Sequence, residues 1–115
     1  MRLPDFDKAE IPEAKITGYL LNPDHPRGRS KAEFLGRFGF RRDECTMLRD
    51  ALRAHSRSND VVAQHQTAYG TRYEVDGPLS APDGRAPLVR VVWFIENGET
   101  LPRLVTLVPL KRPKR

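Results

Sequence analysis

The sequence predicts an α+β domain, in which two or three N-terminal helices pack on one face of a roughly four-stranded antiparallel sheet. Three observations support this. Apolar residues recur every three or four positions up to about residue 56, they alternate with polar residues after about residue 60, and turn residues separate the alternating segments. Helices that precede strands are typical of a fold in which one sheet face is covered and the other stays open.

Three segments of the N-terminal half have the pattern of helices. The first covers residues 12–21, and the prolines that follow it end it, because a residue before proline is disfavoured in helical conformation. The second begins at Gly28 or Ser30 and ends at about Phe38. The third covers residues 43–56, with the aspartate at its start as the N-cap.

Four segments of the C-terminal half are expected to be strands: 61–67, 71–75, 88–95 and 103–110. Asp76-Gly77-Pro78 has the composition of a turn and should end the second of them. The third is the clearest strand, because Val89, Val91 and Trp93 form one continuous apolar face. We expect residues 1–110 to form a single domain, followed by a basic tail at 111–115.

Composition and charge limit the environment of the chain. Its longest apolar run falls short of a membrane span and no secretory signal is visible, so a cytoplasmic location without membrane contact is expected. The single cysteine, Cys45, fits a reduced, half-buried side chain better than a nucleophile. Four basic residues of the tail carry +4 of the net charge of +5, so the domain itself is nearly neutral. That tail is either a solvated end or a phosphate-binding segment.

Several motifs of cofactor chemistry are missing from the sequence. There is no pair of cysteine ligand motifs, no histidine pair at helical spacing around a glutamate, no phosphate-binding loop and no nucleophile elbow. We therefore expect no metal site, no cofactor and no nucleotide site. What remains suits cleavage of RNA without metal, which needs proton-transfer groups and cations near the phosphate.

A turn between the first two helices holds the most specific chemistry. His25 lies between two prolines, close to Arg27 and Lys31. Histidine is the usual acid or base near neutral pH. One interpretation is that His25 or Lys31 transfers a proton here. The other is structural: His25 holds the turn by a hydrogen bond to a backbone carbonyl, and Lys31 only caps the turn.

Three arginines lie on three different predicted strands: Arg72, Arg90 and Arg103. If their outward faces match, they would bind phosphate, which suits the planar guanidinium group. Each is equally able to form a cross-strand ion pair with Glu74, Asp76 or Glu96. Tyr69 and Thr106 are candidate hydroxyl donors to a substrate.

The segment 19–35, YLLNPDHPRGRSKAEFL, followed by Gly39-Phe40, resembles an LLNPxHPxGxxKAxFF…LGF signature. That signature belongs to a bacterial family of uncharacterised domains, related to toxin modules of polymorphic and phage-borne toxins. Segments 69–73, 82–85, 92–95 and 102–106 resemble the rest of the pattern. Those modules are grouped with the barnase, EndoU, colicin and RelE-like ribonuclease fold, whose active site lies on the sheet.

This resemblance implies a set of site residues. His25, Lys31, Arg72 and Thr106 become candidate catalytic positions. The residue types and their predicted placement, without the resemblance, make Arg27, Arg90, Arg103 and Tyr69 candidate substrate contacts. The expected function is a small metal-independent endoribonuclease toxin, which acts on RNA and is neutralised by a cognate antitoxin or immunity protein. The alternative is a non-catalytic module that binds RNA or a protein, such as an antitoxin-like partner.

Overall fold

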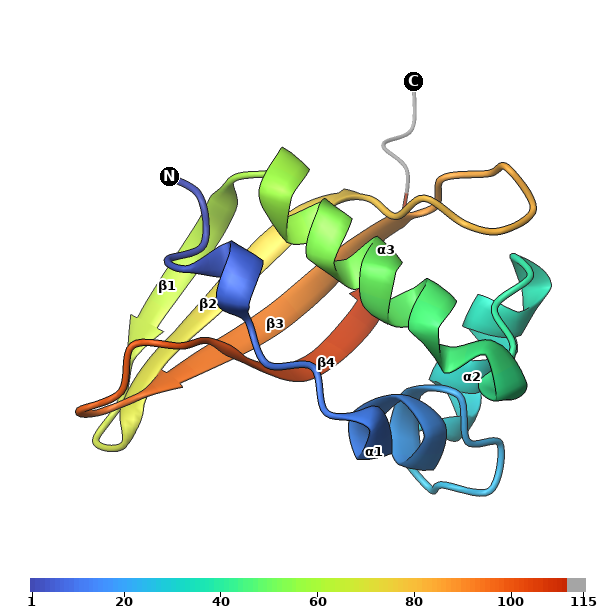
Figure 1. Cartoon of the computed structure of the whole chain (residues 1–115), viewed down its shortest axis with the longest axis horizontal. Coiled ribbons are helices and arrows are strands. Elements are labelled where there is room, and N and C mark those ends of the chain that lie inside the picture. The colour runs from blue at the N-terminus through green and yellow to red at the C-terminus, as the bar shows by residue number, and fades with distance from the viewer. Residues whose placement is uncertain (112–115) are drawn as a thin grey trace.

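A computed structural model describes residues 1–111 of the chain. Its helical elements are η1 (Phe6–Lys8), α1 (Glu13–Lys15), the π-helical turn η2 (Ile16–Leu20), α2 (Arg29–Arg37), η3 (Arg42–Glu44) and α3 (Cys45–Ser58). Its strands are β1 (Val61–Gln66), β2 (Gly70–Pro78), β3 (Leu88–Glu96) and β4 (Arg103–Pro109). The predicted α+β fold, with helices before strands, is confirmed (Figure 1). The predicted basic tail lies outside the described residues, apart from Lys111.

The four strands form one antiparallel meander in the order β1-β2-β3-β4. Helix α3 crosses one face of this sheet, while α1 and α2 lie at one end of it, next to β4 (Figure 1). The segment before α1 also reaches β4, because Glu10 pairs with Arg103 through an isolated parallel bridge. The opposite face of the sheet is left uncovered by α3.

The core lies between α3 and the sheet. Leu48 and Leu52 of α3 are fully buried, and so are Val91 and Trp93 of β3. Each of these side chains contributes roughly 1.5–3 kcal/mol by leaving water. The residues that alternation placed on one apolar face, Val89, Val91 and Trp93, are all buried, and Val92 on the other face is buried as well.

One segment differs from its prediction. Asp76-Gly77-Pro78 is not a turn but the last part of β2, paired with β3. A Cβ atom at Gly77 would lie 2.2 Å from Oδ1 of Asn59, the residue that follows α3. Glycine therefore allows β2 to lie close to this side chain. Asp76 stays in the strand because Arg90, its partner in the register, binds its carboxylate.

The predicted N-cap of the third helix is also different. Asp43 lies within η3, and its two carboxylate oxygens accept hydrogen bonds of 3.1 Å from Arg41. The hydrogen bond from Arg41 holds the pKa of Asp43 below its usual value. Helix α3 begins two residues later, at Cys45, without a side-chain cap. The carboxylate is already bound to a guanidinium, so it is not free to accept the helix amides.

Candidate functional site on the open face of the sheet

The side chains on the open face fall into rows across the strands. One row is His65, Arg72, Phe94 and Arg103; the next is Ala63, Glu74, Val92 and Thr106; the third is Asp76, Arg90 and Val108. Directly paired residues project to the same side of a sheet. Four residues predicted for the site, Arg72, Arg90, Arg103 and Thr106, therefore share this face.

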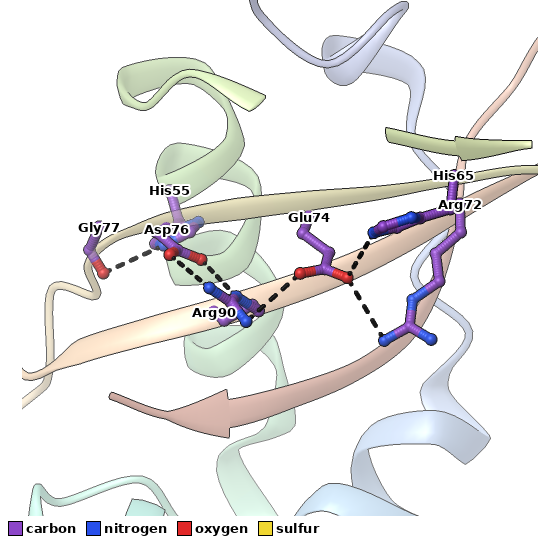
Figure 2. A network of polar contacts seen from close by, with 7 residues as sticks. All are labelled: His55, His65, Arg72, Glu74, Asp76, Gly77 and Arg90. Carbon is purple, nitrogen blue, oxygen red and sulfur yellow. Dashed lines mark hydrogen bonds and ion pairs between the residues drawn. The ribbon is translucent and has the colours of Figure 1, made fainter. Parts of the chain in front are cut away.

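Glu74 is the centre of a charged cluster on this face (Figure 2). Glu74 is only 9% exposed, yet its carboxylate lies close to two guanidinium groups and one imidazole. Arg90 Nη1 lies 3.3 Å away, Arg72 Nη2 3.6 Å and His65 Nε2 3.4 Å. Among residues 1–111, none of these contacts has hydrogen-bond geometry. Glu74 is a candidate for function because its carboxylate lies at the centre of these three basic side chains on the open face.

The arginines on this face differ in how firmly they are bound. Arg90 donates two hydrogen bonds to Asp76, of 2.8 and 2.9 Å, and this contact raises the pKa of Arg90 further above its usual value. Among residues 1–111, Arg72 has only the long contact to Glu74. Arg103 has two contacts of 3.7 Å, to carboxylates of Glu10 and Glu96. Long ion pairs at exposed sites contribute little, so Arg72 and Arg103 are the guanidinium groups available to a ligand.

His25 organises the turn between η2 and α2. Its Nδ1 accepts hydrogen bonds of 3.0 Å from the backbone amides of Arg27 and Gly28. The imidazole thus holds the turn, as one interpretation proposed, but by accepting from amides instead of donating to a carbonyl. A neutral ring with an acceptor at Nδ1 carries its proton on Nε2. In this conformation His25 offers an N–H donor.

Tyr19 connects this turn to the open face. Its ring centroid lies 4.9 Å from that of His25, and its hydroxyl lies 2.8 Å from the Thr106 hydroxyl on β4. Lys15 donates to the Val105 carbonyl at 3.2 Å and lies 5.4 Å from the centre of the Tyr19 ring. A shallow hollow at this edge is lined by Lys15, Tyr19, His25 and Arg103, among others. An imidazole, a phenol and two cations therefore meet beside β4.

The structure does not bring the other predicted residues into this cluster. Tyr69 is 80% exposed in the turn between β1 and β2. Lys31 is half-buried in the first turn of α2, and Arg27 is exposed in the preceding turn. Within the part of the chain that the structure describes, these three side chains make no hydrogen bond or ion pair. Their predicted roles stay predictions.

Sequence reasoning missed Glu74 and Tyr19 as candidates and did not select His65. Glu74 was considered only as a partner for arginine, and Tyr19 as part of a helix face. The short turn after β1 contained the missing signal, because it sets the register in which His65 lies opposite Arg72 and one row from Glu74. Among residues 1–111 no group of three or more His, Cys, Asp or Glu side chains could hold a metal ion, and no helix could cross a membrane.

Comparisons with known proteins give a family and a fold. The chain belongs to a family described as a domain of unknown function (DUF6883), whose profile matches residues 2–111. No curated protein matches it. A chain of the contact-dependent growth inhibition toxin–immunity protein complex from Klebsiella pneumoniae 342 has a similar structure, with a TM-score of 0.73 and 16% identity. That match covers 93% of this chain and 97% of the other, and at this identity it shows a shared fold.

Proposed function

We propose that this protein is a metal-independent endoribonuclease that acts as the toxin of a bacterial toxin–antitoxin or polymorphic toxin system. The observation that carries the proposal is Glu74, a residue only 9% exposed whose carboxylate is surrounded by an imidazole and two guanidinium groups. The fold adds support, since it is similar to that of a chain in a growth-inhibition toxin–immunity complex.

The residues of the cluster suit cleavage of RNA by its own 2′-hydroxyl. Glu74 accepts the proton of that hydroxyl, whose oxygen attacks the neighbouring phosphorus. The bond from phosphorus to the 5′-oxygen breaks, and protonated His65 gives its proton to this leaving oxygen. The products are a 2′,3′-cyclic phosphate and a 5′-hydroxyl. Arg72 stabilises the negative charge that grows on the phosphate oxygens.

The residues beside β4 support binding in this proposal. His25 presents an N–H donor and Thr106 a hydroxyl held by Tyr19, both suited to phosphate or ribose oxygens. Arg103 adds a positive charge to the same edge. Arg90 keeps Glu74 and Asp76 in place instead of contacting the phosphate itself. A cognate antitoxin or immunity protein would inhibit the enzyme by covering this face.

The test is cleavage of labelled total bacterial RNA by the purified protein, with and without chelator. Glu74→Gln keeps the shape of the side chain but removes the base, and should lower the cleavage rate by about 10²–10⁴-fold. Glu33→Gln on α2, an exposed carboxylate outside the cluster, is the matched control and should cleave like the unchanged protein. Intact RNA in every lane, from protein shown to be folded, would reject the nuclease.

A second function has its own supporting observation. The cations Arg72, Arg90 and Arg103 all lie beside carboxylates, so the open face is nearly neutral, which suits a protein partner as well as RNA. The chain would then be a non-catalytic binding module, such as an immunity or antitoxin-like partner. Expression in a bacterial host separates the two functions: a toxin arrests growth unless its partner is present, and a binding module is produced freely.

A further inference from the structure

A hollow of about 380 Å³ lies where β3 and β4 meet the segment before α1. Phe94, Glu96, Glu99, Arg103 and Lys15 are among its lining residues. We propose that this hollow binds a nucleobase of single-stranded RNA, with the base stacked on Phe94 and an adjoining phosphate held by Arg103 and Lys15. The inference rests on the proposed function and names its substrate class.

Phe94 is an aromatic ring on the charged side of the sheet. Its neighbour Trp93 is fully buried in the core, whereas Phe94 projects to the open face, paired with Arg72 on one side and Arg103 on the other. Gly70 makes room for the ring, since a side chain there would lie 2.8 Å from Cε2 of Phe94. The ring therefore stays half-buried and keeps part of its surface in the hollow. Such a ring is a stacking platform for any base.

Two cations border this ring. The side chain of Arg103 is 57% exposed, and within the described part of the chain its contacts with carboxylates are all long. Lys15 donates one hydrogen bond, to the Val105 carbonyl, and an ammonium group has three donors. Both groups keep donors for a phosphate next to the stacked base. Aromatic rings and cations in alternation are the usual arrangement for binding a single strand.

The rim of the hollow limits which base fits. Glu96 and Glu99 are exposed carboxylates, which only accept hydrogen bonds. Adenine, cytosine and guanine each present an amino group to such acceptors, whereas uracil presents two carbonyl oxygens and one N–H. The hollow should therefore prefer a base with an amino group to uracil. A duplex should bind weakly, because its bases are stacked on one another and cannot reach Phe94.

Binding is measured by fluorescence anisotropy with the Glu74→Gln protein, so that the RNA stays intact. The probes are short single strands that differ only in whether one position is uridine or an amino-bearing base, together with a matched duplex. Phe94→Leu in this background should weaken single-strand binding by about 5–100-fold, the effect of losing one stacked base. Phe94→Tyr keeps the ring and should bind normally. Met47→Leu, on an exposed part of α3, is the control.

The outcomes separate this inference from the nuclease itself. The base site would be overturned if Glu74→Gln proteins with and without Phe94→Leu bound the single strand equally well. It would also be overturned if duplex and single strand bound with equal affinity. In either case, RNA cleavage by the unchanged protein would still support the nuclease. If Phe94→Tyr fails as Phe94→Leu does, the ring is not a stacking platform. If no folded form of the protein binds or cleaves RNA, both the base site and the nuclease are overturned. The hollow would then be a contact surface for a protein partner.

Discussion

The side-chain hydroxyls of Tyr19 in η2 and Thr106 in β4 lie 2.8 Å apart, although the residues are 87 positions apart in the sequence. This contact joins the N-terminal helical region to the edge strand of the sheet. It also places the turn around His25 beside the open face, since the Tyr19 ring packs against the imidazole. The two predicted site regions, the turn and the sheet, meet through this pair.

Removing one hydroxyl of this pair should destabilise the fold. Tyr19→Phe and Thr106→Val should each lower the free energy of unfolding by about 1 kcal/mol, since each leaves a partly buried hydroxyl without its partner. The double variant should lose less than the sum of the two, as measured by urea unfolding. Strictly additive losses would show that the two hydroxyls do not interact in solution.

Gly28 should not tolerate a side chain. A Cβ atom there would lie 2.0 Å from the Tyr19 carbonyl oxygen, which is backbone and cannot move away easily. Gly28→Ala should therefore cost about 1–3 kcal/mol of unfolding free energy, as overpacking does.

Gly36 is the matched control for this substitution. It lies in α2, where a methyl group would have no neighbouring atom within 4 Å, so Gly36→Ala should stabilise the helix by roughly 0.5–1 kcal/mol. Thermal unfolding of both variants checks the pair. Equal effects of the two substitutions would contradict the close approach of Gly28 to Tyr19.

The order of elements could be predicted because their periodicity follows directly from burial. Val89, Val91 and Trp93 are apolar since their face of β3 covers the core, and Leu48 and Leu52 recur at helical spacing for the same reason. The end of β2 could not be predicted, because Asp76, Gly77 and Pro78 stay in the strand through pairing with β3, a segment distant in the sequence. Local composition alone indicates a turn at such a place.

The candidate site was harder to predict than the fold. Alternation showed that Arg72 and Glu74 face the same side, but not that Glu74 would be nearly buried beside two guanidinium groups and an imidazole. That depends on the register of three strands, which the sequence sets only through its turns. Whether each arginine is free to bind a ligand likewise depends on its carboxylate partner. Arg72 has a long contact with Glu74, whereas Arg90 is hydrogen-bonded to Asp76.

Stability should fall in mild acid because of His55. This histidine is 2% exposed, its Nε2 lies 3.2 Å from the Gly77 carbonyl, and its Nδ1 has no partner among the described residues. Burial lowers the pKa of His55 below its usual value of 6.5. The unfolded chain then binds a proton that the folded chain does not, so stability is full above about pH 6.5 and decreases as the pH falls below it.

The variant His55→Gln tests this assignment, because glutamine does not titrate and retains an N–H donor for the Gly77 carbonyl. The free energy of unfolding should be measured by urea denaturation from pH 7.5 down to about pH 5. The unchanged protein should lose more stability over this interval than His55→Gln. Parallel curves for the two proteins would assign the acid sensitivity to other groups.

Arg72 and Arg90 should differ in their contribution to RNA binding. Each phosphate contact that a single strand makes adds about 0.7 to the slope of log affinity against log salt. Arg72 is half exposed and, among the described residues, has only a long ion pair, so Arg72→Gln should lower both the affinity and this slope. Arg90 is bound by Asp76 through two hydrogen bonds, so Arg90→Gln should leave the slope unchanged and lower the stability instead.

The measurement is a salt titration of single-stranded RNA binding in the Glu74→Gln background, with urea unfolding of the same proteins. If Arg90→Gln lowers the slope as much as Arg72→Gln does, then Arg90 leaves Asp76 to contact RNA. Arg90 would in that case bind phosphate together with Arg72, as the sequence analysis expected. If only Arg72→Gln reduces the slope, phosphate binding is assigned to Arg72. The guanidinium group of Arg72, unlike that of Arg90, is not already held by hydrogen bonds.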